Sequence, residues 1–423
     1  MKSIFIPQSR AIDGSIRIPG SKSLSNRAIL IASLAKGQSI LEGVLDSDDT
    51  KHMIQAWIDL GVSVQKKQPG EVHITGCAGL PGPFNSEIYV ENAGTAARFL
   101  TAALTLGQGS YTLNGNERMQ QRPILDLINA LKELGASLRD LQGTGCPPVK
   151  IEGGLKGGSV SIPGEKSSQY VSALMMTAPL ASQDTTINIT GELVSRTYVE
   201  MTRKIMETFQ VNCEWRNEQT IYVPGQQQYL GQHYQIEGDA SSASYFFGMA
   251  AITGGRIEVS GIQRESTQGD IGLVNVLEKM GCHVEWQQDR VILEGRPLKA
   301  VDVDMNTMSD VAPTLAVVAL FAEGKTTITN VGNMRIKECD RIAAVTTELR
   351  KLGAEVEELE EGLIITGNGN YQGAELATYL DHRMAMSFSL AGLRIPGVKI
   401  LDPGCVSKTF PDFYDYFLPL IQE

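Results

Sequence analysis

The chain has 423 residues, of which 42% are hydrophobic and 20% are charged, a composition typical of a globular protein with a large core. This length exceeds one ordinary core and predicts two or three domains. A formal net charge of −11 argues against nucleic acid or an anionic membrane as a partner. The sequence has no apolar run of about 18 to 20 residues, and its first residues, MKSIFIPQSR, lack a signal-peptide pattern. We expect a cytoplasmic protein.

The cysteines and histidines give no sign of a metal site. The six cysteines and five histidines are scattered, with no CxxC pair and no histidine at metal-ligand spacing. This distribution argues against structural zinc and against a disulfide framework, and it favours reduced, buried thiols. We therefore expect no bound metal.

One pattern occurs six times along the chain, at intervals of about seventy residues. An apolar helical run of small residues is followed by a polar turn and by a short β-branched strand that ends in glycine. The copies are RAILIASLAKGQSILEG, ARFLTAALTLGQGSYTLNG, YVSALMMTAPLASQDTTINITG, ASYFFGMAAITGGRIEVSG, APTLAVVALFAEGKTTITNVG and RMAMSFSLAGLRIPGVKILDPG. Their closing glycines are Gly43, Gly115, Gly191, Gly261, Gly332 and Gly404. Such a period predicts an architecture of repeated units.

A second helix and an alternating strand follow each of the first five copies. Four of these helices end at a glycine, as a helix C-cap requires: Gly61, Gly135, Gly281 and Gly353. The sixth copy lacks this half. The full unit reads β-α-β-α-β-β, which is long enough to close a small mixed sheet. We predict an α/β fold of six such repeats, three in each of two lobes.

Two glycine-containing junctions are the predicted crossing points between the lobes. Residues 20–238 would form one lobe, and residues 1–19 plus 239–423 would form the other. The hinge would lie near 19–21 and 237–239, with the ligand site between the lobes. The alternative is two successive domains without a functional hinge.

The first polar cluster, PGSKSLSNRAIL, lies at a predicted helix start. Lys22, Ser23 and Arg27 fall within its first two turns, where free N–H groups and the helix dipole favour an anion. The cluster is not a Walker loop, because GxxxxGK[ST] is absent. The alternative is an ordinary serine-capped helix with solvated basic residues.

The second copy has Gly94 before its helix and Arg122 after its closing glycine. Gly94 would let a ligand approach the backbone, and Arg118 and Arg122 can present a fork to phosphate or carboxylate. An exposed, salt-bridged arginine pair is the alternative. The second copy thus predicts an anion-binding loop.

The third copy offers neutral hydrogen-bonding groups: Ser167, Ser168, Gln169, Ser195 and Tyr198. This chemistry suits a small molecule that carries phosphate and hydroxyl groups. N-capping by the serines is the alternative for the first group.

The second half of the chain supplies acids as well as bases. Its candidates are Asp310, Asn333, Lys337, Glu338, Arg341, Arg383 and Lys408. Asp310 lies at a predicted helix start, for which an N-cap is the alternative. The run GNMRIKECDRIAA has a solvated charged face as its alternative. We interpret the second half as a mixed acid–base site.

The fourth copy, GDASSASYF with IQRESTQGD, is poor in cations and is assigned a mainly structural role.

The motifs PGSKSLSNRA, LDSDDT, NAGTAARFL, RMQQRPI, SSQYVSALMMTAPLA, TYVEMT, GDASSASYF, IKECDRI, DHRMAMS and DPGCVSKTFPDF follow one another from end to end of the chain. Together they resemble the 5-enolpyruvylshikimate-3-phosphate synthase family, transferases of the shikimate pathway to chorismate and the aromatic amino acids. The resemblance implies a two-lobed inside-out α/β barrel that closes over shikimate 3-phosphate and phosphoenolpyruvate. It implies enolpyruvyl transfer to the 5-hydroxyl, with loss of phosphate from a tetrahedral intermediate and without a cofactor.

The resemblance also implies roles for individual residues. Shikimate 3-phosphate would meet Lys22, Ser23, Arg27, Ser167, Ser168, Gln169, Ser195, Tyr198, Asp310, Asn333 and Lys337. Phosphoenolpyruvate would meet Lys22, Gly94, Arg122, Gln169, Arg341, Arg383 and Lys408. The acid–base groups would be Asp310 and Glu338, with Lys22 as a third candidate.

Three positions depart from the family pattern: Ala97, Phe99 and Cys339. We expect inhibition by glyphosate, the family's phosphoenolpyruvate-competitive inhibitor, because Gly94 leaves room for it. A UDP-N-acetylglucosamine enolpyruvyl transferase is the nearest alternative, but Glu117 stands where that family carries a reactive cysteine or aspartate. A non-catalytic anion-binding repeat protein is the other. We expect a monomer.

Overall fold

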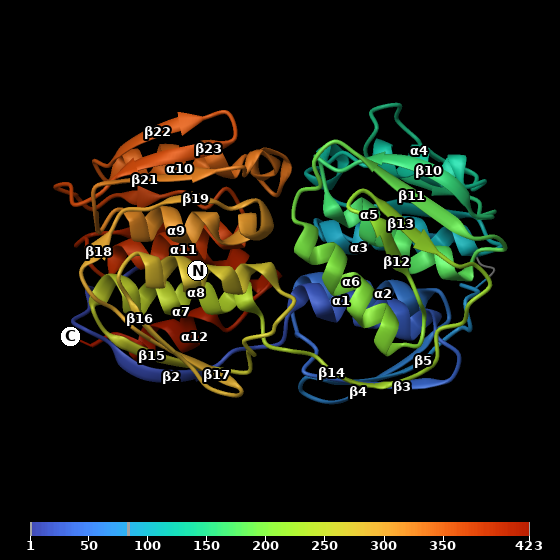
Figure 1. Ribbon diagram of the computed structural model, residues 1–423, viewed down its shortest axis with the longest axis horizontal. Helices are drawn as coiled ribbons and strands as arrows, with labels where there is room; N and C mark the ends of the chain where they lie inside the picture. The colour runs from blue at the N-terminus through green and yellow to red at the C-terminus, as the bar shows by residue number, and fades with distance from the viewer. Residues whose placement is uncertain (1, 83–84, 423) are drawn as a thin grey trace. The chain divides into compact units, whose positions relative to one another are not determined.

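The computed structural model describes residues 2–82 and 85–422, which form two compact units of mixed α/β structure (Figure 1). Unit 1 comprises Met1–Pro19 and Glu237–Glu423, and unit 2 comprises Gly20–Ile236. Each unit contains a hydrophobic core made only from its own residues. Within the described ranges, the helices are too short or too polar to cross a membrane.

The twelve described strands of unit 2 form three sheets with one common design. Their orders are β14-β3-β5-β4, β6-β7-β9-β8 and β10-β11-β13-β12. In each sheet the first two strands are parallel and the remaining neighbours are antiparallel. The strands are β3 (Gln38–Glu42), β4 (Ser63–Gln68), β5 (Glu71–Thr75), β6 (Ser86–Tyr89), β7 (Tyr111–Asn114), β8 (Leu138–Asp140), β9 (Val149–Ile151), β10 (Gly158–Pro163), β11 (Thr185–Thr190), β12 (Glu214–Asn217), β13 (Thr220–Val223) and β14 (His233–Gln235).

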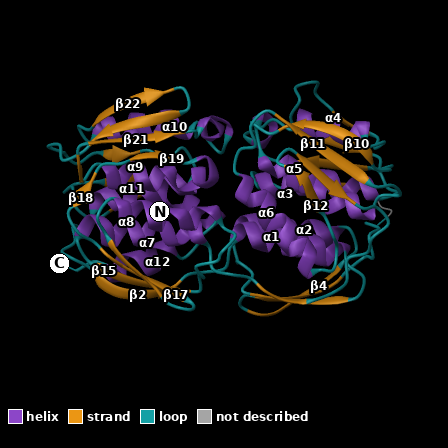
Figure 2. Cartoon of the chain, viewed as in Figure 1, coloured by secondary structure: helices purple, strands orange, loops and turns teal. Residues whose placement is uncertain are grey.

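In unit 2 the sheets lie toward the surface, with helices between them (Figure 2). The helices are α1 (Lys22–Leu34), α2 (Asp48–Asp59), α3 (Gly94–Ala103), α4 (Leu125–Glu133), α5 (Ser168–Thr177) and α6 (Arg196–Thr208). Helices α1, α3 and α5 come from the repeated apolar runs and are buried along almost their whole length. A helix that is apolar on every face is stable only when it is enclosed, so these runs form the centre of the unit.

Unit 1 uses the same arrangement, completed by strands from the start of the chain. Its four-stranded sheets have the orders β2-β15-β17-β16 and β19-β21-β23-β22, and smaller sheets are β1-β25-β24 and β18-β20. The strands are β1 (Ser3–Phe5), β2 (Asp13–Arg17), β15 (Arg256–Ser260), β16 (His283–Trp286), β17 (Arg290–Glu294), β18 (Leu298–Lys299), β19 (Asp302–Asp304), β20 (Ala322–Glu323), β21 (Lys325–Thr329), β22 (Glu355–Leu359), β23 (Gly362–Thr366), β24 (Glu375–Leu376) and β25 (Lys399–Leu401). Strand β2 is parallel to β15, and β1 is antiparallel to β25.

The helices of unit 1 are α7 (Ala240–Thr253), α8 (Gly272–Lys279), α9 (Ala312–Ala319), α10 (Arg341–Lys351), α11 (His382–Gly392) and α12 (Phe413–Phe417). Helices α7, α9 and α11 contact one another and are buried along their whole length. Three short 3₁₀ helices matter for the site: η5 (Asn306–Val311), η6 (Gly332–Ile336) and η7 (Pro403–Lys408).

The predicted helix-terminating glycines are confirmed. Gly61, Gly135, Gly281 and Gly353 have φ values of 83°, 93°, 118° and 86°. This is the left-handed region that glycine enters without a Cβ penalty, so each residue ends its helix and starts the next strand. Glu237 and Gly238, which the sequence assigned to the middle lobe, are part of unit 1.

Candidate functional site

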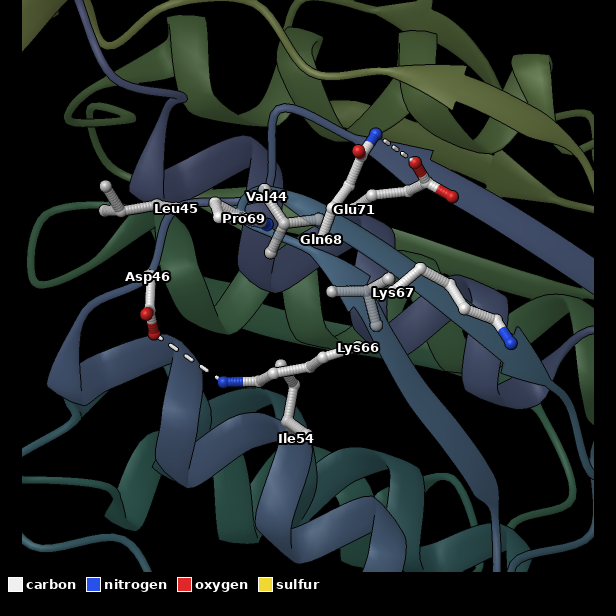
Figure 3. Close-up of a pocket in the computed structure, with 11 residues that line it drawn as sticks. Val44, Leu45, Asp46, Ile54, Lys66, Lys67, Gln68, Pro69 and Glu71 are labelled. Carbon is white, nitrogen blue, oxygen red and sulfur yellow. Dashed lines mark hydrogen bonds and ion pairs between the residues drawn. The ribbon is translucent and has the colours of Figure 1, made fainter.

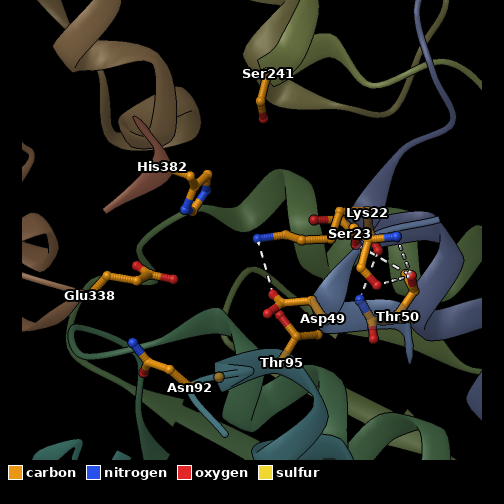
Figure 4. Close-up of polar contacts among 12 residues, drawn as sticks. Lys22, Ser23, Asp49, Thr50, Asn92, Thr95, Ser241, Glu338 and His382 are labelled. Carbon is orange, nitrogen blue, oxygen red and sulfur yellow. Dashed lines mark hydrogen bonds and ion pairs between the residues drawn. The ribbon is translucent and has the colours of Figure 1, made fainter. Parts of the chain in front are cut away.

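The first predicted cluster lies at the N-terminus of α1. The Ser21 side chain caps this helix by accepting a hydrogen bond from Leu24 N (3.4 Å), and Ser23 is half-buried beside it. The Lys22 ammonium lies 3.6 Å from Asp49 Oδ2, and the two side chains point toward one another (Figure 4). Because their exposed fractions are only 12% and 4%, Asp49 holds the ammonium at a helix end that favours an anion.

Arg27 joins three helices of unit 2. Its Nε donates to Thr202 Oγ1 (2.7 Å), and Nη2 donates to Ser172 Oγ and Tyr198 O (3.3 Å each). Nη1 donates to Ser23 O at 3.0 Å. Burial lowers the pKa of Arg27 to about 10, so it stays charged at neutral pH. Its charge therefore sits at the junction of α1, α5 and α6 rather than on a solvated face.

Phe99, one of the departures from the family pattern, supports this arginine. Phe99 and Ala97 lie on α3 and are fully buried. The Arg27 guanidinium lies 5.1 Å from the centre of the Phe99 ring, a cation–π distance. Phe99 thus acts through packing beneath Arg27.

Arg122 is held against the start of α3. Its Nη1 donates to the backbone and side-chain oxygens of Asn92 at 3.1 Å each, and the residue is 5% exposed. A Cβ on Gly94 would collide with the Arg122 guanidinium. A side chain at position 94 would therefore force the Arg122 guanidinium to move.

Arg98 is part of the framework of this loop. It donates from Nη1 to Gly94 O (3.2 Å) and from Nη2 to Pro123 O (2.9 Å). Tyr170 Oη donates to the same Pro123 oxygen at 2.6 Å. These bonds tie the Gly94 loop to the segment that follows Arg122, so the two arginines are ordered together.

The predicted neutral cluster lies at the start of α5. Ser167 is the N-cap, and its Oγ accepts from Gln169 N at 3.2 Å. The Gln169 Nε2 donates to Thr95 Oγ1 on α3 at 3.2 Å, and Ser168 is 6% exposed. The capping alternative is therefore confirmed for Ser167, and the side chain of Gln169 joins the starts of α3 and α5.

Ser195 and Tyr198 lie at the start of α6. Ser195 is the N-cap in a left-handed conformation (φ 54°) and is 4% exposed. Its carbonyl accepts from Tyr198 N at 3.0 Å, and the Tyr198 ring lies 5.7 Å from the Arg27 guanidinium. A serine held at positive φ is strained, and such strain is common where a side chain is positioned for function.

In unit 1, Arg341 is the centre of a buried ionic cluster. Its Nε and Nη2 donate to the two oxygens of Asp381 (2.8 and 3.2 Å). Its Nη1 and Nη2 also donate to Asp310 (3.0 Å) and Glu338 (2.8 Å). Burial alone would lower the pKa of Arg341, but Asp381, Glu338 and Asp310 together raise it above its usual value. The alternative of a solvated charged face is therefore wrong for Arg341, which is only 1% exposed.

Asp310 also contacts two further cationic side chains. Arg383 Nη2 donates to its Oδ2 at 2.6 Å, and Lys337 Nζ lies 3.7 Å from its Oδ1. Burial, and to a smaller extent the charges of Arg341 and Arg383, lower the pKa of Lys337, which Asp310 opposes. Asp310 thus lies among three cationic groups, an arrangement that can bind or exchange protons with a polar ligand.

The N-cap alternative for Asp310 is wrong. Asp310 lies within η5, and Val311 is the residue that precedes α9. Its carboxylate accepts hydrogen bonds from the side chains of Arg341 and Arg383. Asn333, on η6, donates from Nδ2 to Ser309 Oγ at 3.3 Å, and Lys408 is half-buried at the end of η7, which packs on α11.

Sequence reasoning missed four contributors to these clusters: Asp49, Ser241, Asp270 and Asp381. Asp381 caps α11 by accepting from Arg383 N at 2.9 Å while it also binds Arg341. Arg383 Nη2 also lies 3.4 Å from Ser241 Oγ, which in turn bonds Asp270. The fourth copy, for which a mainly structural role is expected, thus contributes Ser241 and Asp270 to the surroundings of Arg383. An acid directly before a basic helix start was the available signal for Asp381.

A cavity of about 270 Å³ in unit 2 lies apart from these clusters (Figure 3). Lys66 Nζ lies 3.6 Å from Asp46 Oδ1, and Gln68 Nε2 donates to Glu71 Oε2 at 2.6 Å. The lining residues are Val44, Leu45, Asp46, Ile54, Lys66, Lys67, Gln68, Pro69, Gly70, Glu71 and Val72. None of them is a predicted site residue.

The six cysteines are free, with Cys146 and Cys282 buried and the other four half-buried. Cys339 Sγ lies 3.5 Å from Asp381 Oδ2, so this departure from the family pattern packs against the Arg341 cluster. In residues 2–82 and 85–422, no three His, Cys, Asp or Glu side chains are grouped so as to hold a metal ion.

Comparison with known proteins gives one consistent result. A family model described as EPSP synthase (3-phosphoshikimate 1-carboxyvinyltransferase) matches residues 6–417. Proteins named 3-phosphoshikimate 1-carboxyvinyltransferase from Aliivibrio salmonicida and Citrobacter koseri are each 49% identical, over 422 and 418 residues, with 98% of both chains covered. The solved structure of EPSP synthase from Acinetobacter baumannii has a TM-score of 0.84 at 29% identity and covers 99% of this chain and 98% of that one.

Proposed function

From the premise that the chain belongs to the EPSP synthase family, we propose which of its side chains act on each substrate. The protein is a 3-phosphoshikimate 1-carboxyvinyltransferase of the shikimate pathway. It transfers the enolpyruvyl group of phosphoenolpyruvate to the 5-hydroxyl of shikimate 3-phosphate and releases phosphate. The enolpyruvyl transferase expected from the motifs is thus confirmed.

The phosphoenolpyruvate groups are proposed to be Lys22, Gly94, Arg122, Gln169, Arg341, Arg383 and Lys408. What supports this set is the way its arginines are held. Asn92 fixes Arg122, and Asp310 and Asp381 fix Arg341 and Arg383 through bonds of 2.6–3.2 Å. Arginines that are ordered before the ligand arrives lose little entropy when they bind a carboxylate or phosphate.

The shikimate 3-phosphate groups are proposed to be Lys22, Ser23, Arg27, Ser167, Ser168, Gln169, Ser195, Tyr198, Asp310, Asn333 and Lys337. Most of them lie at the starts of α1, α5 and α6. Such helix starts favour a phosphate, and the serine and amide groups match its neighbouring hydroxyls. The buried charge of Arg27, ordered by four hydrogen bonds, would attract the phosphate.

We propose Asp310, Glu338 and Lys22 as the proton-transfer groups. In the addition step the 5-oxygen bonds to C2 of phosphoenolpyruvate, the hydroxyl proton leaves, and C3 gains a proton. In the elimination step C3 loses a proton and the C2–phosphate bond breaks. Asp310 and Glu338 share the Arg341 guanidinium, at 3.0 and 2.8 Å, so two carboxylates with different surroundings lie at one cation.

The assay that tests this function follows phosphate release from purified protein with shikimate 3-phosphate and phosphoenolpyruvate. Release should require both substrates, and Asp310→Asn and Glu338→Gln should each lower kcat by about 10²–10⁴-fold. The exposed Asp46, which pairs only loosely with Lys51 and Lys66 at 3.6 Å, supplies the control Asp46→Asn with unchanged kcat. Release with UDP-N-acetylglucosamine instead of shikimate 3-phosphate would overturn the assignment.

We further propose that glyphosate inhibits the enzyme by competition with phosphoenolpyruvate, and that the protein is a cytoplasmic monomer. What supports inhibition is that Gly94 carries no side chain beside the Arg122 guanidinium. Full activity at millimolar glyphosate would contradict the first point. Sedimentation at a dimer mass would contradict the second.

We also infer the architecture of an inside-out barrel with three β-α-β-α-β-β repeats in each lobe and a hinge at the crossing points. Its support is that five sheets share one order of parallel and antiparallel neighbours, around buried helices. At the second crossing, Ile236 N donates to Glu42 O and Gly238 N donates to Gly261 O (2.8 Å each). Only Glu237 lies between these two anchored positions.

A further inference from the structure

Glu348 on α10 is a buried carboxylate that no step of the reaction uses. Its side chain has no exposed surface, and it accepts three different donors. Lys351 Nζ lies 2.8 and 2.6 Å from its two oxygens, Ala377 N donates at 2.9 Å, and Tyr379 Oη donates at 2.7 Å. Removing a charge from water is unfavourable unless it is bonded in this way, so the site is built around the carboxylate.

The segment that Glu348 binds has a strained backbone. Tyr379 and Leu380 both have φ values of 54°, in the left-handed region. Only glycine, and occasionally asparagine or aspartate, enters this region readily, and Leu380 is an apolar side chain with 73% exposure. Two such residues in succession persist only where surrounding contacts hold them.

The strained segment leads directly into the Arg341 cluster. Asp381 N donates to Thr378 O at 2.8 Å, which closes a turn around Tyr379 and Leu380. The next residues are Asp381, which binds Arg341, and Arg383, which binds Asp310. The direction in which Asp381 and Arg383 leave the turn therefore depends on the conformation of the two strained residues.

Helix α10 holds this segment at two points. Arg341 lies at the start of α10 and binds Asp381, while Glu348, seven residues later, binds Ala377 and Tyr379. Residues seven apart lie on one face of a helix, two turns apart. Partial burial and the hydrogen bond to Glu348 raise the pKa of Tyr379 above its usual value, so the phenol keeps the proton that it donates.

We propose that Glu348 is a positioning residue for phosphoenolpyruvate binding, which holds residues 377–380 in the strained turn that sets Asp381 and Arg383. This inference rests on the proposed assignment of Arg341 and Arg383 to phosphoenolpyruvate. Glu348 touches no substrate in this scheme. It acts through the turn, so its loss should change the affinity for one substrate selectively.

The test compares Glu348→Gln and Tyr379→Phe with the native enzyme in the phosphate-release assay. Glutamine keeps the shape of the Glu348 side chain but places an amide NH₂ group, itself a donor, against the donors that the carboxylate binds. Phenylalanine removes the hydrogen bond from the Tyr379 hydroxyl to Glu348. We expect KM for phosphoenolpyruvate to rise about tenfold with Glu348→Gln and about threefold with Tyr379→Phe. KM for shikimate 3-phosphate should stay within about twofold for both variants. Glu357→Gln, on the exposed face of β22, is the matched control and should change neither KM.

A rescue variant tests the role of the turn itself. Adding Leu380→Gly to Tyr379→Phe should return KM for phosphoenolpyruvate toward the native value, because glycine adopts the left-handed conformation without strain. If Glu348→Gln does not fold, Tyr379→Phe and this double variant still test the proposal. An equal rise of both KM values, or no rise in either variant, would overturn it.

One further variant separates this inference from the function on which it rests. Arg383→Lys should raise KM for phosphoenolpyruvate if Arg383 binds that substrate. If it does so while Glu348→Gln and Tyr379→Phe leave KM unchanged, only the positioning role is wrong. If Arg383→Lys leaves KM unchanged, the assignment of Arg383 is itself wrong.

Discussion

At the scale of single residues, Asp270 illustrates how a buried acid is tied to the site. The Ser241 hydroxyl bonds its carboxylate and lies 3.4 Å from Arg383 Nη2. Burial, followed by the negative charges of Asp310 and Asp239, raises the pKa of Asp270 to about 6, although Arg383 and Ser241 oppose the shift. The cluster around Arg383 therefore contains a group that titrates near neutral pH.

This pKa predicts a pH dependence of stability. An unfolded aspartate has a pKa of about 3.9, so between pH ~4 and ~6 the native state keeps a proton that the unfolded state loses. The contribution of Asp270 to the unfolding free energy should fall as pH rises through this window, by up to about 3 kcal/mol, and stay constant above it. Asp270→Asn removes the titration. The unfolding free energy of the variant, relative to that of the native protein, should therefore rise from pH 4 to pH 7.

Urea unfolding at several pH values measures this difference. Asp289→Asn is the control, because Asp289 is 56% exposed in the same unit and pairs with Arg290 at the surface. Parallel pH profiles for Asp270→Asn and the native protein would show that Asp270 does not titrate in this range.

At the scale of elements, the packing of α7 depends on one glycine. Gly248 lies where α7 meets α9 and α11, and a Cβ there would come within 2.9 Å of Leu390, 3.3 Å of Thr314 and 3.4 Å of Val318. Helix propensity alone favours alanine over glycine by about 1 kcal/mol. Crowding in a close-packed core costs about 1–3 kcal/mol, so the two effects oppose each other.

We expect crowding to win, so Gly248→Ala should lower the unfolding free energy by about 1 kcal/mol and Gly248→Val by about 3 kcal/mol. Chemical denaturation measures both. Gly404→Ala is the control, because nothing lies within 4 Å of a Cβ at that position, and it should change stability by less than about 0.5 kcal/mol. A more stable Gly248→Ala would mean that the helices separate easily.

Elements were also the level at which the sequence was most informative. The apolar runs predicted buried helices, and four glycines predicted helix ends: Gly61, Gly135, Gly281 and Gly353. Both signals depend only on residues that are close together in the sequence. The role of Asp310 could not be predicted in this way. A capping acid and an acid that binds arginines look the same in sequence, and only the distances to Arg341 and Arg383 separate them.

At the scale of the whole molecule, the two cores make different demands on the chain. The core of unit 2 contains only residues between 24 and 236. The core of unit 1 combines residues between 240 and 417 with four residues from the start of the chain: Ile6, Ile12, Ile16 and Ile18. Strands β1 and β2 complete two sheets of unit 1. A continuous fragment can therefore contain all of unit 2 but not all of unit 1.

We predict that residues 20–236 fold alone, with cooperative urea unfolding, and that residues 237–423 do not. Attaching residues 1–19 after residue 423 through a flexible linker of about ten residues should restore folding of this fragment, because the addition supplies β1 and β2 and Arg10 N bonds Gln422 O at 2.8 Å. Circular dichroism and urea titration of the three fragments measure this. Cooperative unfolding of 237–423 alone would show that β1 and β2 are dispensable.

The sequence by itself determined the class of fold and the family, and it predicted the repeat, because helix period, turn glycines and long motifs are encoded locally. It also predicted which basic residues form the site, since each lies at a helix start or after a closing glycine. Only the tertiary structure decided what orders them. Asp49 contacts Lys22, Asp381 contacts Arg341 and Glu348 contacts Tyr379. These partners lie 27, 40 and 31 positions apart in the sequence, and no local pattern encodes such contacts. Partners of this kind are set by how helices and sheets pack, which depends on the whole of each core.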